Sequence, residues 1–128
     1  MLFSNRVVLG FALGAGLLML CGCGEDTASR APEPLAVEQA PTTLEQAFAS
    51  AGGDLKLMAD EAIQFLRNGD YPRALVALQK LTSRTDLDGH QRGLASQALL
   101  TANQKVAEAA EKGNAEAEKL LRYRSANK

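Results

Sequence analysis

The first 22 residues constrain this chain more than any other part, because they have the order of an export leader rather than of a folded segment. Arg6 and the amino terminus supply positive charge, and an uncharged, largely apolar run of 14 residues follows from Val7 to Leu20. A membrane-spanning helix needs roughly 20 apolar residues, whereas the apolar part of an export signal needs only about 7–15. We therefore expect residues 1–22 to be a signal peptide that is removed, so that the mature protein begins at Cys23.

The sequence Leu20-Cys21-Gly22-Cys23 resembles the lipobox of bacterial lipoproteins. That family has an aliphatic residue three positions before the modified cysteine and a small residue directly before it, and Cys23 fits both positions. Cys21 does not fit, because Leu20 stands where the signal peptidase of the family requires Gly, Ala or Ser. The resemblance implies that Cys23 is lipidated with several acyl chains, which hold a protein stably on a membrane. Since Gly24 is not the Asp associated with inner-membrane retention, it favours the outer membrane of a two-membrane host.

Two other interpretations of the cysteines remain open. One is an ordinary secretory leader or uncleaved anchor with incidental cysteines, and the other is a Cys-x-Cys metal pair. No His or further Cys lies nearby to complete a metal-ligand set. We expect no metal site and no cofactor.

The composition favours an all-α protein. Hydrophobic residues make up 46% of the 128 residues but aromatic ones only 5%, and Trp is absent, which suits closely packed helices better than a sheet. Removing Arg6 with the leader leaves 13 basic residues against 15 acidic ones, a net charge of about −2. Because a nucleic-acid binder needs a strong basic excess, we expect no nucleic-acid partner.

Residues 23–41 are interpreted as the lipidated cysteine followed by a flexible linker. The stretch is polar and acidic, contains Pro32, Pro34 and Pro41, and shows little periodicity. A flexible chain of this length spans on the order of 25 Å, enough to hold a domain clear of the lipid headgroups.

Helical signals predict one domain over residues 42–128. Thr42 or Thr43 begins a capping box, which predicts a short first helix that stops at Gly52-Gly53. Asp54 is the expected N-cap of a second helix, whose apolar residues recur at helical spacing. These apolar residues are Leu55, Met58, Ala59, Ala62, Ile63, Phe65 and Leu66.

A third helix follows after one short turn. Gly69 ends the second helix, Asp70 is the expected N-cap of the third, and Pro72 lies in its first turn, where a missing amide costs little. Two helices joined by so short a turn must be antiparallel neighbours. The third helix is expected to bury Ala74, Leu75, Leu78 and Leu81.

These two helices resemble a tetratricopeptide repeat over about residues 55–84. Residues 69–75, Gly-Asp-Tyr-Pro-Arg-Ala-Leu, resemble its interhelical turn and second helix. Ala62 and Phe65 stand where the family has a small and an aromatic residue on its first helix. Glu61 replaces the usual Leu, so the repeat is degenerate. The resemblance implies a helical hairpin with a concave binding face.

A long fourth helix is predicted from Asp88, which forms a capping box with Gln91, to Lys112. Gly113-Asn114 closes it and opens a short last helix with an acidic first turn and a basic end, an order that favours the helix dipole. This turn echoes residues 68–70. Because repeat arrays generally need three or more units, one unit and an echo must be buttressed by flanking helices or by a partner.

The sequence offers no catalytic constellation. The only His, His90, lies at a helix start, where a solvated surface residue is usual. No serine has Gly-x-Ser-x-Gly context, and no second His exists to complete a triad. The pair Asp60-Glu61 is interpreted as a solvated helix face, and Asp86 with Asp88 as a loop and a cap. We therefore expect that the protein is not an enzyme.

The basic tail from Arg122 to Lys128 loosely resembles the end of murein lipoprotein, whose terminal Lys is joined to peptidoglycan. The resemblance implies that Lys128 tethers the domain to the cell wall. The alternative is a frayed basic end that caps the last helix.

Two functional hypotheses follow. The first is a lipid-anchored cell-envelope scaffold whose concave face, near Phe65, Tyr71 and the long helix, binds a peptide or protein. The alternative is a structural envelope spacer or peptidoglycan tether, in which the lipid and the tail matter and no groove does.

Overall fold

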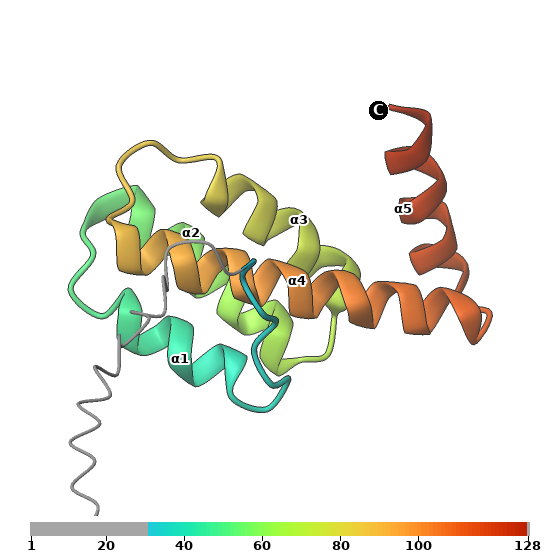
Figure 1. The fold of residues 1–128 in the computed structure, drawn as a ribbon, viewed down its shortest axis with the longest axis horizontal. Helices are drawn as coiled ribbons and strands as arrows, with labels where there is room; N and C mark the ends of the chain where they lie inside the picture. The colour runs from blue at the N-terminus through green and yellow to red at the C-terminus, as the bar shows by residue number, and fades with distance from the viewer. Residues whose placement is uncertain (1–30, 128) are drawn as a thin grey trace, which may run out of the picture. The chain divides into compact units, whose positions relative to one another are not determined.

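The computed structural model describes residues 31–127, and the predicted leader, Cys23 and Lys128 lie outside the described residues. Within that part the chain forms helices only, which confirms the all-α prediction (Figure 1). The helices are α1 (Ala40–Ala47), α2 (Gly53–Arg67), α3 (Tyr71–Thr82), α4 (Gly89–Glu111) and α5 (Ala115–Ala126). None of them is both long enough and apolar enough to cross a bilayer.

The first helix begins earlier than the sequence predicts. α1 starts at Ala40 with Pro41 in its first turn, whereas the capping signal pointed to Thr42 or Thr43, so that prediction is wrong. Pro41 favours the earlier start because its φ is already helical and its missing N–H would have had no partner inside the helix. Ala40 and Pro41 are buried, so the end of the expected linker belongs to the folded core.

The residues just before α1 are also fixed to the domain. The hydroxyl oxygen of Thr101, a buried residue of α4, lies 2.6 Å from the carbonyl oxygen of Leu35 and 3.1 Å from that of Gln97. A buried hydroxyl needs such partners, because leaving it unpaired costs about 1–3 kcal/mol. The segment before α1 is therefore bound to α4 through the Leu35 carbonyl.

The second helix departs from its predicted cap. α2 starts at Gly53, which has a φ of +55°, and its N-cap is Gly52. Asp54 lies in the first turn and receives no capping bond, so the prediction of an N-cap at Asp54 is wrong. Its carboxylate still lies at the positive end of the helix dipole, where a negative charge is favourable.

The turn between α2 and α3 forms as predicted. Gly69 has a φ of +67°. The Asp70 amide donates to the Phe65 carbonyl at 2.9 Å and the Gly69 amide to the Leu66 carbonyl at 3.1 Å, the two bonds of a Schellman motif. The Asp70 side chain then accepts from the Arg73 amide at 3.2 Å, so one residue both closes α2 and caps α3.

The turn between α4 and α5 repeats this arrangement. Gly113 has a φ of +83°. The Asn114 amide donates to the Ala109 carbonyl at 2.9 Å, and the Gly113 amide donates to the Ala110 carbonyl at 2.9 Å. The Asn114 side chain accepts from the Ala117 amide at 2.9 Å. The echo in the sequence is thus the same backbone motif used twice.

The predicted capping box at the start of α4 is also confirmed. The Gln91 amide donates to Asp88 Oδ1 at 2.7 Å, and the Asp88 amide donates to Gln91 Oε1 at 3.2 Å. The buried Gln91 side chain also donates to the Ala47 carbonyl at 3.3 Å, which ties the start of α4 to the end of α1.

The core lies where α3 packs against α2 and α4, and where α1 packs against the same two helices. Alanines such as Ala62, Ala74 and Ala98 are fully buried and allow the helices to approach closely. The prediction that α3 buries Ala74, Leu75, Leu78 and Leu81 is confirmed. α5 buries Ala117 alone. Most of the packing free energy therefore belongs to the first four helices. The largest fully buried side chains are Phe48, Leu44, Ile63, Leu75, Leu78, Leu81, Val106 and Thr101.

Candidate functional site

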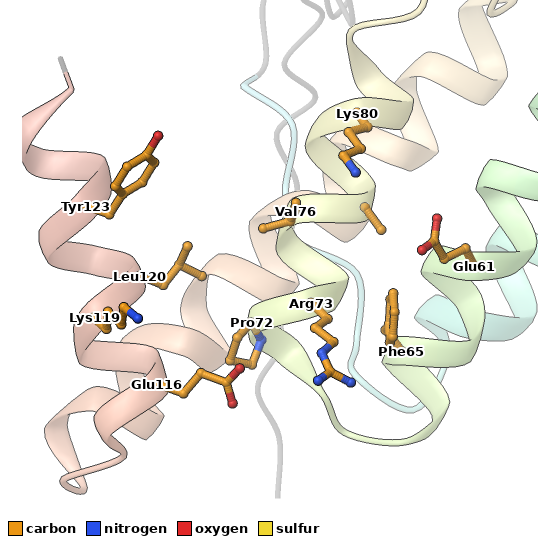
Figure 2. Close-up of a pocket in the computed structure, with 11 residues that line it drawn as sticks. Glu61, Phe65, Pro72, Arg73, Val76, Lys80, Glu116, Lys119, Leu120 and Tyr123 are labelled. Atoms are coloured by element: carbon orange, nitrogen blue, oxygen red, sulfur yellow. The ribbon is translucent and has the colours of Figure 1, made fainter.

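A groove of about 500 Å³ crosses α3 between α2 and α5 (Figure 2). α3 runs between the other two helices, and α5 stands apart from α1 and α2 (Figure 1). The residues that line the groove come from α2, α3 and α5: Glu61, Phe65, Pro72, Arg73, Val76, Ala77, Lys80, Glu116, Lys119, Leu120 and Tyr123.

The walls of the groove are apolar and only partly covered. Val76 points from α3 toward α5, while Leu120 and Tyr123 lie on the α5 wall (Figure 2). Tyr123 is 68% exposed and Val76 is 37% exposed, and Leu120 and Phe65 are half-buried. In the described chain the only other large hydrophobic side chain this exposed is Leu57. Exposed apolar surface of the domain is therefore concentrated at this groove, as at a binding site.

The rim of the groove carries charges of both signs that lack partners. Glu61, Lys80, Glu116 and Lys119 form no ion pair within residues 31–127. Arg73 lies 3.5 Å from Asp70, at long range for an ion pair. Elsewhere in the domain some exposed charges are paired, as in the Arg67–Glu45 bridge at 2.6 Å. The rim is thus available for charges of another molecule.

α5 is attached to the domain at both ends and, between them, through Leu120 and Leu121, which pack partly against the core. Ala117, in its first turn, is fully buried. Near its other end, Arg124 donates to the side-chain oxygen of Asn103 on α4 at 2.6 Å. Between these points α5 leaves the exposed face of α3, including Val76, uncovered.

The structure does not bring the two predicted binding residues together. Phe65 lines the groove, but Tyr71 lies in a separate hollow of about 370 Å³ beside the segment that precedes α1. The long helix α4, expected to form part of the binding face, contributes no lining residue to the groove among those described. Sequence reasoning missed Val76, Leu120 and Tyr123. The apolar pair Leu120 and Tyr123, three positions apart on the last helix, was the signal available.

The residues considered for catalysis lie in two separate segments, α2 and the loop that leads into α4 together with the first turn of α4. His90 is exposed in the first turn of α4, and Asp60 pairs with Lys56 along α2. Asp86 is held by Arg84, and Asp88 caps α4. Over residues 31–127, no group of three or more His, Cys, Asp or Glu side chains is arranged to hold a metal ion.

Two exposed ion pairs outside the groove shift the pKa of their carboxyl groups. Arg84 donates to Asp86 at 2.8 and 2.6 Å, and this hydrogen bonding lowers the pKa of Asp86 below its usual range. On α4, the hydrogen bond from Lys105 at 2.7 Å lowers the pKa of Glu108 in the same way. The first pair lies in the loop between α3 and α4 and the second on α4, so neither borders the groove.

The groove has the properties of a surface that receives a helix or an extended segment of polypeptide. Apolar walls provide anchor sites, and charges at the edge set orientation. In comparisons with protein-family models, with curated proteins and with solved structures, the chain has no significant match.

Proposed function

We propose that this chain is a lipid-anchored protein of the bacterial cell envelope whose helical domain binds protein in the groove between α2, α3 and α5, without catalysis. The groove itself is the observation that supports binding. Its walls expose Val76 and Tyr123, and its rim charges other than Arg73 form no ion pair within the described chain.

The leader and Cys23 support the anchor. The sequence from residue 1 to Cys23 has the charge, apolar length and lipobox of a lipoprotein signal. The Leu35 carbonyl is held by Thr101 of α4, so the helical domain begins no later than Leu35.

The α2–α3 hairpin supports a tetratricopeptide-like interpretation of the domain. The two helices pack closely, with Ala62 and Ala74 fully buried, and their turn uses Gly69 as that family does. A single hairpin of this kind does not enclose a binding groove by itself. Here α5 supplies the second wall of the groove.

Tyr123 is the expected centre of the binding energy. Tyrosine is enriched among interface residues whose truncation costs about 2 kcal/mol or more. Its ring is exposed over the groove, so a partner can cover it without rearranging the core. Loss of 2 kcal/mol corresponds to roughly 30-fold weaker binding.

A photo-crosslinking experiment tests the binding proposal. A photoreactive phenylalanine analogue replaces Tyr123 in the full chain, in the cells that make it, and the same analogue at Gln104, exposed on α4 outside the groove, is the control. We expect a defined protein product from position 123 that disappears with Val76→Asp. No product, or the same product from position 104, would contradict the proposal.

The anchor is tested with the two cysteines as a matched pair. Cells that express Cys23→Ser or Cys21→Ser are labelled with a radioactive fatty acid. We expect Cys23→Ser to lose the label and Cys21→Ser to keep it, because only Cys23 has a small residue before it. If the Cys23→Ser variant were labelled as strongly as the Cys21→Ser variant, the lipid-anchor proposal would be overturned.

A further inference from the structure

We infer that the occupant of the groove is α5 of a second copy of this chain, so that the protein forms a two-fold symmetric dimer. The inference rests on the proposed function, because it names the partner of the same groove. Three features of α5 and of the groove rim lead to it.

The first feature is that α5 is a mostly polar helix that covers its few apolar side chains only partly against its own chain. It has 12 residues, a length of roughly 18 Å, and only Ala117 is buried against its own chain. Leu120 and Tyr123 face the groove and remain half-buried and exposed. The same helix therefore offers both one wall of a groove and the apolar stripe that such a groove takes.

The second feature is the charge of the rim. A two-fold interface brings a surface against its own copy, so the surface must be complementary to itself. The unpaired rim charges are two acids and two bases: Glu61, Glu116, Lys80 and Lys119. The acidic side chains of one copy can therefore pair with the basic side chains of the other. A rim of one sign would repel its copy and would select a partner of opposite charge.

The third feature is that the described chain has no second surface on which several large hydrophobic side chains are exposed together. Leu57, its remaining large exposed hydrophobic residue, lies on α2 outside the groove lining. When α3 and α5 of one copy meet α3 and α5 of another, four helices share one apolar centre, an arrangement of known stability. A dimer also supplies the additional packing surface that a single repeat unit needs for stability.

Sedimentation equilibrium of the full chain, extracted from membranes in a density-matched detergent, tests the inference. We expect the mass of two chains for the wild type, and an association at least tenfold weaker for Tyr123→Asp, since a two-fold interface loses both rings and gains two charges. Lys119→Glu is the second variant and is expected to weaken the dimer because it leaves the rim mostly acidic. Both side chains are exposed, so helical content by circular dichroism should not change.

Leu57→Asp is the matched control, because Leu57 is 67% exposed and Tyr123 is 68% exposed. It should leave the dimer intact. A wild-type monomer at all concentrations, or a Tyr123→Asp variant that stays dimeric, would overturn the inference. A monomer that crosslinks through position 123 to a different protein would overturn the second-copy inference and keep the proposed function. A monomer with no crosslinked product would contradict both.

Discussion

The turns at Gly69 and Gly113 have the same backbone motif, yet the helices that follow them behave differently. Each turn has a glycine with positive φ, two Schellman hydrogen bonds, and a polar side chain that caps the next helix. After the first turn, α3 buries one whole face between α2 and α4. After the second, α5 buries Ala117 and leaves Leu120 and Tyr123 partly or largely uncovered.

This difference shows that the turn and the packing are set by different parts of the sequence. The turns depend on a few adjacent residues, so both form locally. The packing depends on the apolar residues that the following helix carries to the core. α3 brings three large fully buried leucines, Leu75, Leu78 and Leu81, whereas α5 brings none. The result is one helix that completes the core and one that completes a groove.

The largest expected effect on stability comes from truncating one leucine in α3 and one in α5. Leu78→Ala removes a fully buried side chain and should lower the free energy of unfolding by about 2–5 kcal/mol. Leu120→Ala removes a half-buried one and should cost about 1 kcal/mol or less in the dilute monomer. Urea unfolding followed by circular dichroism measures both. Equal losses would mean that α5 is as firmly packed as α3.

Enlarging the small buried residue at the start of each helix gives the next largest effect. Ala74→Leu should lower the free energy of unfolding by about 1–3 kcal/mol, because α2 and α4 leave no room for the added carbons. Ala117→Leu should instead release α5, with faster amide exchange over residues 118–126 and little change in the urea midpoint. A large midpoint shift for Ala117→Leu would show that α5 unfolds together with the core.

Alanine at the two turn glycines separates the shared motif from the unequal packing. Gly69→Ala and Gly113→Ala meet no neighbouring atom within 4 Å, so their effect comes from positive φ alone, at about 1 kcal/mol each. We expect Gly69→Ala to lower global stability and Gly113→Ala to affect amide exchange of α5 only. Gly93→Ala, inside α4 with open space around it, is the control and should stabilise by up to about 1 kcal/mol.

These turns also mark what could be predicted from the sequence. The caps at Asp70 and Asp88 and the helix break at Gly113-Asn114 were predicted correctly, because each depends on residues within four positions. The starts of α1 and α2 were not, because competing local signals lay close together. α1 begins at Ala40 with Pro41 in its first turn rather than at the threonines. α2 begins at Gly53, which has a positive φ, rather than at Asp54.

The binding face was harder to predict, because it depends on how α5 leaves α4. Phe65 and Tyr71 were predicted to share a binding face, but Phe65 lines the groove together with Tyr123, and Tyr71 lines a separate hollow. Tyr71 was predicted as a binding residue because it belongs to the tetratricopeptide-like turn motif. The position of Tyr123 depends on the direction of α5, which no local pattern encodes.

The smallest expected effect concerns pH and the loop between α3 and α4. The pKa of Asp86 is lowered by its hydrogen bonds to Arg84, so folding favours the ionised carboxyl. This stabilisation is complete above the ordinary pKa of 3.8 and is lost as the pH falls through the lower folded value. We expect the wild type to lose slightly more stability than Asp86→Asn between pH 5 and pH 3. The pair is exposed, so salt should reduce the difference.

Side-chain footprinting of Tyr123 tests most directly whether the groove is occupied in the cell. Hydroxyl radicals label the Tyr123 ring in native membranes and in dilute purified protein, with Leu57 as the equally exposed reference. A protein held in the groove predicts that Tyr123 is labelled several-fold less in membranes, while Leu57 is labelled equally in both. Equal labelling of Tyr123 in the two samples, with the purified protein diluted until it is monomeric, would mean that α5 and α3 face open water and that the groove binds nothing.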